Sequence, residues 1–148
     1  MTNALYTKWK QALVQQAQTF KTLDVNDGGV NNPYCALVTI GAGAYVYSAA
    51  HQYYSDIGGT NIQGTPQPIL APTLTPGSTG VVFDGGDCTY IPVFGTSVGG
   101  LIIYRHNSGA NTTWRLVYYY DTTGFGLPVT PNGGNVIVSW NPSGIFLW

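Results

Sequence analysis

Few side chains in this sequence have the chemistry of a reactive or metal-binding site, and the acidic ones fall in turn-like stretches. Asp84 and Asp87 flank two glycines in FDGGDCTY (83–90), where carboxylate and backbone oxygens could hold a hard cation such as calcium. A calcium loop of the EF-hand type closes with a glutamate, and this sequence contains none. A turn in which Asp accepts hydrogen bonds from nearby backbone accounts for the same residues. We therefore expect no bound metal and no other cofactor, with calcium at this turn as the open alternative.

The two histidines and the remaining acids do not form a recognisable catalytic set. His51 and His106 have no cysteine or carboxylate at the spacing of metal ligands, so a structural or capping role is expected. The sequence has no G-x-S-x-G, P-loop or dinucleotide-binding motif. A hydrolase with paired carboxylates is the remaining enzymatic hypothesis, but its candidates stand where caps and turns commonly use Asp: Asp56, Asp84, Asp87 and Asp121. We predict that the chain is not an enzyme and has no catalytic residues.

The two cysteines, Cys35 and Cys88, each fall in an apolar or alternating run, YCALVTI and DCTYIPV. We expect both to be buried thiols that pack as small apolar side chains. That expectation fits a chain folded in a reducing cytoplasm, and a single disulfide between them is the alternative.

The composition indicates one β-rich domain over residues 1–148. Charged residues make up 7% of the chain, against about 25% in ordinary soluble domains. Glycine (20), proline (9) and aromatic residues (14%) are abundant, and the net charge is −1. An uncharged polar surface of this kind is typical of a protein inside an assembly, because lone soluble domains usually keep a net charge.

The same numbers argue against several partners. Five basic residues give no electrostatic surface for nucleic acid. No apolar run approaches the length of a membrane-spanning helix, so no membrane partner is expected. The first residues, MTNALYTKWKQALVQQ, lack the apolar core of a signal peptide.

Helical periodicity is confined to the residues before Thr60. Apolar residues at intervals of three and four predict a helix over 3–20, within an N-terminal region of 1–22, with Thr2 or Asn3 as its N-cap. After a strand at 34–40, SAAHQYYSDIGG predicts a short helix that begins at Ser48 and ends at Gly58.

The rest of the chain predicts strands. Residues 60–79 are rich in proline and form either an extended arm or an edge strand. Strand patterns separated by turn residues follow at 80–84, 87–94, 98–105, 113–120, 134–140 and 144–148, and GLPVTPNGGNVIVSW (126–140) predicts a hairpin. We expect a mainly β fold, an antiparallel sandwich or barrel-like domain with an N-terminal helix and one short helix.

Alternation in the strand at 113–120 places Trp114, Leu116, Tyr118 and Tyr120 on one face. Both faces carry bulky residues, so we expect helices or another subunit to cover the second. Without many charges, partner binding must rest on apolar and aromatic side chains. We predict that these come from the Pro-rich arm, the tyrosine-rich strand and the turn after it: Ile69, Leu70, Leu74, Tyr118, Tyr119, Tyr120 and Phe125.

Five segments, in order, resemble a family of small virion structural proteins of tailed phages. They are NALYTKWKQAL (3–13), YVYSAAHQYYSDI (45–57), GVVFDGGDCTY (80–90), GLIIYRHNSG (100–109) and LVYYYDTTGFGLPVTPNGGNVIVSWNPSGIF (116–146). The last is the most specific. The sequence departs from the family pattern at 60–79 and in Cys88, where the family has an apolar residue.

The resemblance is closest to capsid decoration, or cement, proteins. It implies a protein made in the host cytoplasm that binds the outer capsid surface of the virion. Its partners would be the major capsid protein and copies of itself, as a dimer or trimer. A tail, neck or fibre-adaptor subunit is the first alternative, and a carbohydrate-binding module is the second.

Overall fold

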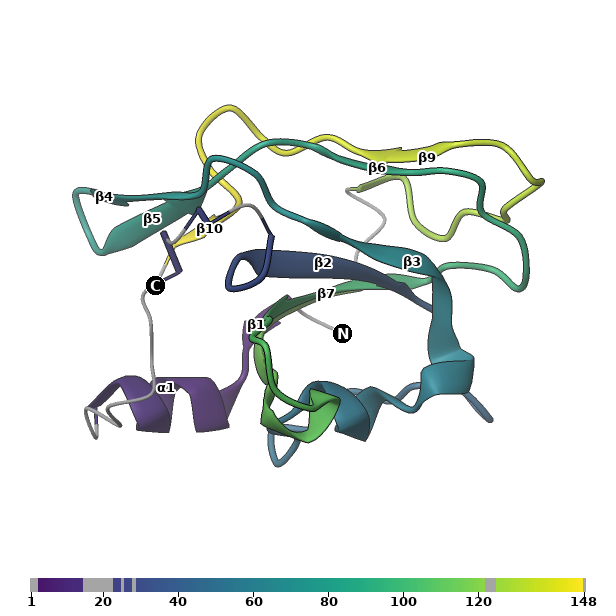
Figure 1. The fold of residues 1–148 in the computed structure, drawn as a ribbon, viewed down its shortest axis with the longest axis horizontal. Coiled ribbons are helices and arrows are strands. Elements are labelled where there is room, and N and C mark those ends of the chain that lie inside the picture. Colours follow the sequence, from purple (N-terminus) through teal and green to yellow (C-terminus); the bar gives the residue numbers. More distant parts are fainter. Residues whose placement is uncertain (1–2, 15–22, 25, 28, 122–124, 148) are drawn as a thin grey trace.

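The computed structural model describes residues 3–14, 23–24, 26–27, 29–121 and 125–147, and it is mainly β with antiparallel sheets. Its elements form three layers (Figure 1): a central sheet, two small sheets on one face, and helices on the other. The central sheet is open, with different strands at its two edges, so the described layers face one another as in a sandwich. The predicted fold class is thus confirmed.

The central sheet has five strands in the order β1-β8-β7-β2-β3. Their bounds are Ala4–Leu5 (β1), Pro33–Val38 (β2), Ile62–Pro68 (β3), Gly100–Arg105 (β7) and Arg115–Tyr120 (β8). Every residue of β7, at the centre of the sheet, is buried. Strands with cover on both faces carry apolar residues without alternation, as in YCALV and GLIIY.

The outer layer consists of two separate sheets. One contains β4 (Thr73–Pro76), β5 (Val81–Asp84) and β10 (Phe146–Leu147), and the other pairs β6 (Cys88–Tyr90) with β9 (Val136–Val138). Each predicted strand from 80–84 onward therefore contains a strand of the structure. The hairpin predicted at 126–140 is wrong in its pairing, because β9 pairs with β6 while Val129 bridges to Val98.

The Pro-rich segment forms strands of the domain itself. Strand β3 pairs with β2 at the edge of the central sheet, where Pro66 and Pro68 are tolerated because one side of the strand needs no ladder partner. Strand β4 pairs with β5. Of the two alternatives for residues 60–79, the structure has the edge strand.

The helical elements begin later along the chain than predicted. Helix α1 spans Thr7–Val14, and residues 15–20 of the predicted helix lie outside the described residues. Asn3 is not its N-cap, because Ala4–Leu5 pairs with β8 before the helix begins; Thr2 lies outside the described residues. Pairing with a strand far along the chain thus overrides local helical periodicity.

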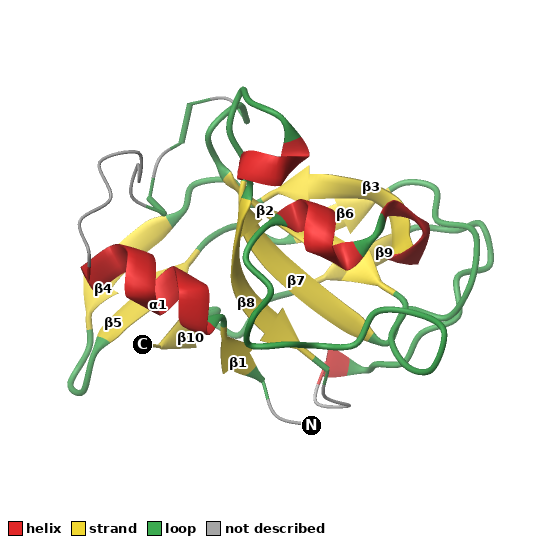
Figure 2. Cartoon of the chain, turned by 90° about the horizontal axis from the view of Figure 1, so that it is seen from below, coloured by secondary structure: helices red, strands yellow, loops and turns green. Residues whose placement is uncertain are grey.

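The short helix predicted from Ser48 is a single 3-10 turn, η1 (Tyr54–Ile57), followed by η2 (Gly59–Asn61). The Asp56 carboxylate accepts hydrogen bonds from the backbone of Gln52 (2.7 Å) and Tyr53 (2.9 Å), which starts the turn there. Gly58 ends it with φ +76°, as predicted. A third turn, η3 (Asn111–Thr113), precedes β8, and Figure 2 shows α1 and the short turns on the same side of the sheet.

A register shift between Ile103 and Tyr104 in the β7–β8 pair changes which side chains share a face. Tyr118 lies opposite Ile103, whereas Leu116 lies opposite Tyr104. Directly paired residues share a face, so Leu116 and Tyr118 point to opposite sides of the sheet. The prediction that they share one face is therefore wrong. Tyr118 faces the outer layer, where its ring stacks on Phe146 at 4.5 Å.

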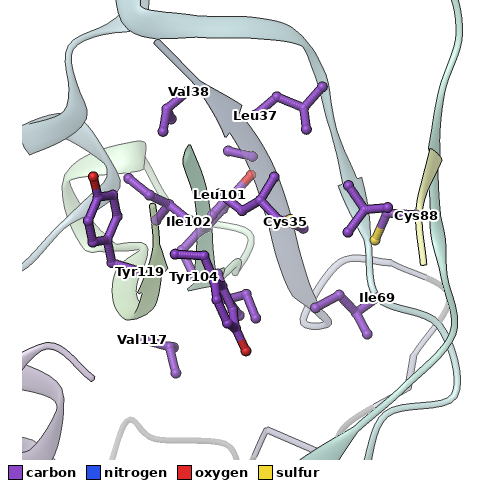
Figure 3. Packing of buried hydrophobic residues seen from close by; sticks show 14 of the residues in the cluster. Cys35, Leu37, Val38, Ile69, Cys88, Leu101, Ile102, Tyr104, Val117 and Tyr119 are labelled. Carbon is purple, nitrogen blue, oxygen red and sulfur yellow. The ribbon is translucent and has the colours of Figure 1, made fainter. Parts of the chain in front are cut away.

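The other face of β8 is covered by the segment between β2 and η1 together with α1 and η1, so of the two expected covers the chain's own elements provide it. Tyr119 stacks on Tyr47 at 5.1 Å and meets the edge of Tyr45 at 5.9 Å. Trp9 of α1 and Ile57 of η1 belong to the same buried core. One connected core thus fills the space on both sides of the central sheet (Figure 3).

Candidate functional site

Three of the seven predicted partner-binding residues lie in the core of the chain. Tyr119 is enclosed by the tyrosines of the helical layer, and the Tyr120 hydroxyl donates to the carbonyl oxygen of Ile145. Ile69 is fully buried, and its backbone N–H donates to the Pro33 carbonyl at 2.8 Å. Because these side chains are packed inside their own domain, the prediction that they contact a partner is wrong.

The other four predicted residues do not form a single site. Tyr118 and Leu74 are half-buried at the β4–β5–β10 sheet, and Phe125 is half-buried beside Tyr120 and Trp140. Leu70 is exposed. Of these, only Phe125 lines the groove described next.

A groove of about 580 Å³ runs between β9 and residues 125–129. Its floor is formed by Leu37 of β2 and Leu101 of β7, which belong to the central sheet. No lining residue is ionisable. The groove therefore suits an uncharged ligand, and its lining includes Phe125, Leu127, Val129, Asn135, Val136, Val138, Ser139, Trp140 and Asn141.

Three large apolar side chains are exposed on or directly after the strands of the β6–β9 sheet. Ile91 is 67% exposed, Phe94 66% and Ile137 61%. Ile137 lies opposite Thr89 in the strand pairing, which places it diagonal to Ile91 just beyond β6. Phe94 packs over Gly133, where any side chain would collide with its ring. We call Ile91, Phe94 and Ile137 the β6–β9 patch.

Sequence reasoning did not single out this patch, although the signal was present. Val136 and Val138 alternate with Ile137, and both are more buried than Ile137. In a strand with one buried face, the residue between two inward valines must point outward. The alternation rule therefore predicts that Ile137 is an exposed apolar side chain.

Asp84 and Asp87 both accept hydrogen bonds from backbone N–H groups. The Asp84 carboxylate accepts from the Gly85 N–H at 2.8 Å, and the Asp87 carboxylate accepts from the Trp140 N–H at 3.0 Å. Within the described part of the chain, no group of three or more His, Cys, Asp or Glu residues is placed to hold a metal ion. The predicted turn hydrogen bond is present at Asp84, whereas Asp87 bonds instead to the distant segment that follows β9.

The histidines lie in aromatic surroundings. His51 accepts or donates at Nδ1 to the Tyr45 hydroxyl at 3.0 Å, and burial raises the pKa of Tyr45 to about 12. His106 bonds to the Val30 carbonyl at 2.6 Å and contacts the rings of Tyr34 and Trp114. These contacts match the structural roles predicted for them.

No model of a known protein family matches the sequence, and a search of curated proteins finds no match either. Among the helices of the described residues, none is long and apolar enough to cross a membrane. The groove and the β6–β9 patch are therefore interpreted from their own chemistry.

Proposed function

We propose that this chain is a structural protein of a tailed-phage virion, a decoration protein that binds the outer capsid surface and stabilises the shell. The β6–β9 patch is the structural observation that carries the binding role: three large apolar side chains face solvent in a chain with 7% charged residues. The phage assignment draws support from the sequence resemblance, above all at residues 116–146. The proposed partners are the major capsid protein and further copies of this chain.

Burial of the patch supplies the binding energy in this proposal. Interface centres are depleted in charge and enriched in aromatic and aliphatic residues, as the patch is. A protein that binds the assembled shell and not the free subunits stabilises the shell by mass action. The Pro-rich segment is no longer a candidate for an arm that reaches a neighbour, because β3 and β4 are paired within the domain.

The first test is the number of copies of this chain in purified virions, measured by quantitative mass spectrometry. Hundreds of copies per particle support a decoration protein, and a few tens or fewer support the tail, neck or fibre-adaptor alternative. Absence from the particle rejects both. The proposal also predicts that raising salt from about 0.1 to about 1 M releases little protein, since the Debye length falls from ~10 to ~3 Å and screens only ionic contacts.

Point variants test the surface itself. Ile91→Ser and Phe94→Ser should each lower occupancy on the particle by about tenfold, the effect of losing a well-packed interface residue. Val46→Ser is the matched control, because Val46 is also exposed (58%) but lies in the segment between β2 and η1. Full occupancy by both patch variants would contradict the assignment of the patch.

A carbohydrate-binding module is the second candidate, and the groove is the observation that favours it. Phe125 offers an aromatic ring there, and Asn135 and Asn141 offer amide groups without charge. Neutral sugars are bound through such a combination of ring stacking and hydrogen bonds. Calorimetric titration of the isolated protein with soluble bacterial polysaccharides tests it, and Phe125→Ala should abolish any heat of binding.

A further inference from the structure

Cys35 and Cys88 lie against one another between two layers of the fold. Cys35 is on β2 of the central sheet and Cys88 begins β6 of the outer layer (Figure 3). Tyr90, two residues after Cys88 and so on the same face of β6, donates a hydrogen bond of 2.8 Å to the Cys35 carbonyl. The Cys88 sulfur lies 3.9 Å from the Pro68 carbonyl, next to Gln67, which pairs with Cys35. Cys35 pairs with Ile103, which pairs with Tyr118 on the face toward the outer layer, so the Cys35 side chain points toward the layer that holds Cys88.

Both thiols are free and buried, as the sequence predicted, with exposed fractions of 0% and 1%. Burial raises the pKa of the Cys35 thiol well above its usual range, so little reactive thiolate exists in the closed structure. The pair is therefore stable as two thiols in a reducing compartment.

We propose that Cys35 and Cys88 form a reversible disulfide that joins the β6–β9 sheet to the central sheet when the folded protein meets a small-molecule disulfide. Antibody domains join their two facing sheets with one disulfide in the same way. The two buried thiols already occupy the space between the layers. This inference does not depend on the proposed function.

The exchange balances in two steps. The Cys88 thiolate attacks one sulfur of the small disulfide, which forms a mixed disulfide and releases one small thiolate. The Cys35 thiolate then attacks the Cys88 sulfur, which forms the 35–88 bond and releases the second small thiolate. The two protein thiols give up two protons and two electrons, and the small disulfide is reduced to two thiols.

Oxidant reaches the pair through the outer layer. The β6–β9 sheet has two strands of three residues each, and sheets of this size open easily. Opening exposes Cys88 first, because it belongs to the moving sheet, whereas Cys35 lies on a strand paired on both sides. Reclosing then brings Cys35 to the mixed disulfide.

The test uses the full chain, reduced and then freed of reductant. The protein is incubated with oxidised glutathione, quenched with acid, denatured, alkylated and weighed by mass spectrometry. We expect the oxidised protein to accept no alkyl group and to carry no glutathione, whereas the reduced protein accepts two. A proteolytic digest should contain a peptide pair that joins Cys35 to Cys88, and dithiothreitol should restore both thiols.

Two variants and a stability measurement make the result decisive. Cys88→Val nearly conserves volume and should fold. Cys35→Ala is the second single variant, and each of the two removes one thiol of the pair. The urea midpoint should rise on oxidation in the wild type and stay unchanged in both variants. Three outcomes would overturn the inference. The wild-type thiols stay open to alkylation after oxidation in urea below the unfolding transition, they keep bound glutathione, or they crosslink only between chains.

Discussion

The hydroxyl groups of Tyr6 and Tyr45 lie 2.6 Å apart in the core and join the residue before α1 to the segment that covers the central sheet. The Tyr45 hydroxyl also lies 3.0 Å from Nδ1 of His51, so three side chains form one chain of hydrogen bonds. Burial and the neighbouring tyrosine raise the pKa of Tyr6 far above its ordinary value. The network therefore depends on both phenols keeping their protons.

Alkaline conditions should unfold the protein. Tyrosine in an unfolded chain ionises near pH ~10, whereas the pKa of Tyr45 and of Tyr54 is raised by burial to about 12. Between these values the unfolded chain binds fewer protons than the folded one, so the free energy of unfolding falls as pH rises. Below about pH 9 the stabilisation is fully present.

Urea midpoints at stepped pH, followed together with tyrosinate absorbance, measure this effect. The midpoint should fall steeply from about pH 10 to about pH 12. In Tyr45→Phe, which loses one of the shifted groups, the fall should be shallower. A wild-type midpoint that stays constant over that range would show that the buried phenols do not govern alkaline stability.

Removal of the Tyr90 hydroxyl should weaken the link between the outer layer and the central sheet. Tyr90→Phe keeps the buried ring but loses the hydrogen bond to the Cys35 carbonyl, at an expected cost of about 1–2 kcal/mol in unfolding free energy. Chemical denaturation measures it. Tyr47→Phe is the control, because its hydroxyl makes no hydrogen bond within the described residues. If the two variants lose the same unfolding free energy, the hydrogen bond from Tyr90 to the Cys35 carbonyl does not stabilise the fold.

Gly85 should not tolerate a side chain. A Cβ atom there would overlap the Cγ2 methyl of Ile69 and approach the Leu70 carbonyl to 3.3 Å. Gly85→Ala should destabilise by about 1–3 kcal/mol through overpacking. Gly59→Ala is the matched control, since a Cβ at Gly59 meets nothing within 4 Å. Thermal melts of the two variants should differ clearly, and similar melts would refute the close approach.

The Asp87 carboxylate should act as a hydrogen-bond acceptor and not as a metal ligand. Asp87→Ala removes the acceptor for the Trp140 N–H and should cost about 1–2 kcal/mol, whereas Asp87→Asn keeps an oxygen there and should cost less. Neither calcium nor a chelator should move the melting temperature of the wild type. A shift on chelation would instead assign calcium to this turn.

Strands were the most predictable part of the fold, because alternation and turn residues are local signals. The pairing of β9 with β6 was not predictable from the turn at Gly133, since a tight reversal specifies a bend and not the partner of the strand that follows. The start of α1 was missed for a related reason: Ala4–Leu5 pairs with β8, and a distant strand is invisible to local periodicity.

The candidate binding surface was harder to predict than the fold. Tyr118, Tyr119 and Tyr120 look alike in sequence, yet two are buried and one is half-buried. Their exposure depends on which layers cover β8 and on a register shift that no composition rule indicates. By contrast, the exposure of Ile137 could be predicted from the sequence, because it alternates with two inward valines.

The pairing of Ala4 with Tyr119 governs when the protein can fold during synthesis. Strand β1 leaves the ribosome first, but its neighbour β8 is among the last strands made. The nascent chain must therefore hold its apolar N-terminal segment unpaired until residue 120 has emerged, and the central sheet closes only then. The β1 edge of the central sheet is therefore among the last parts of the fold that can form.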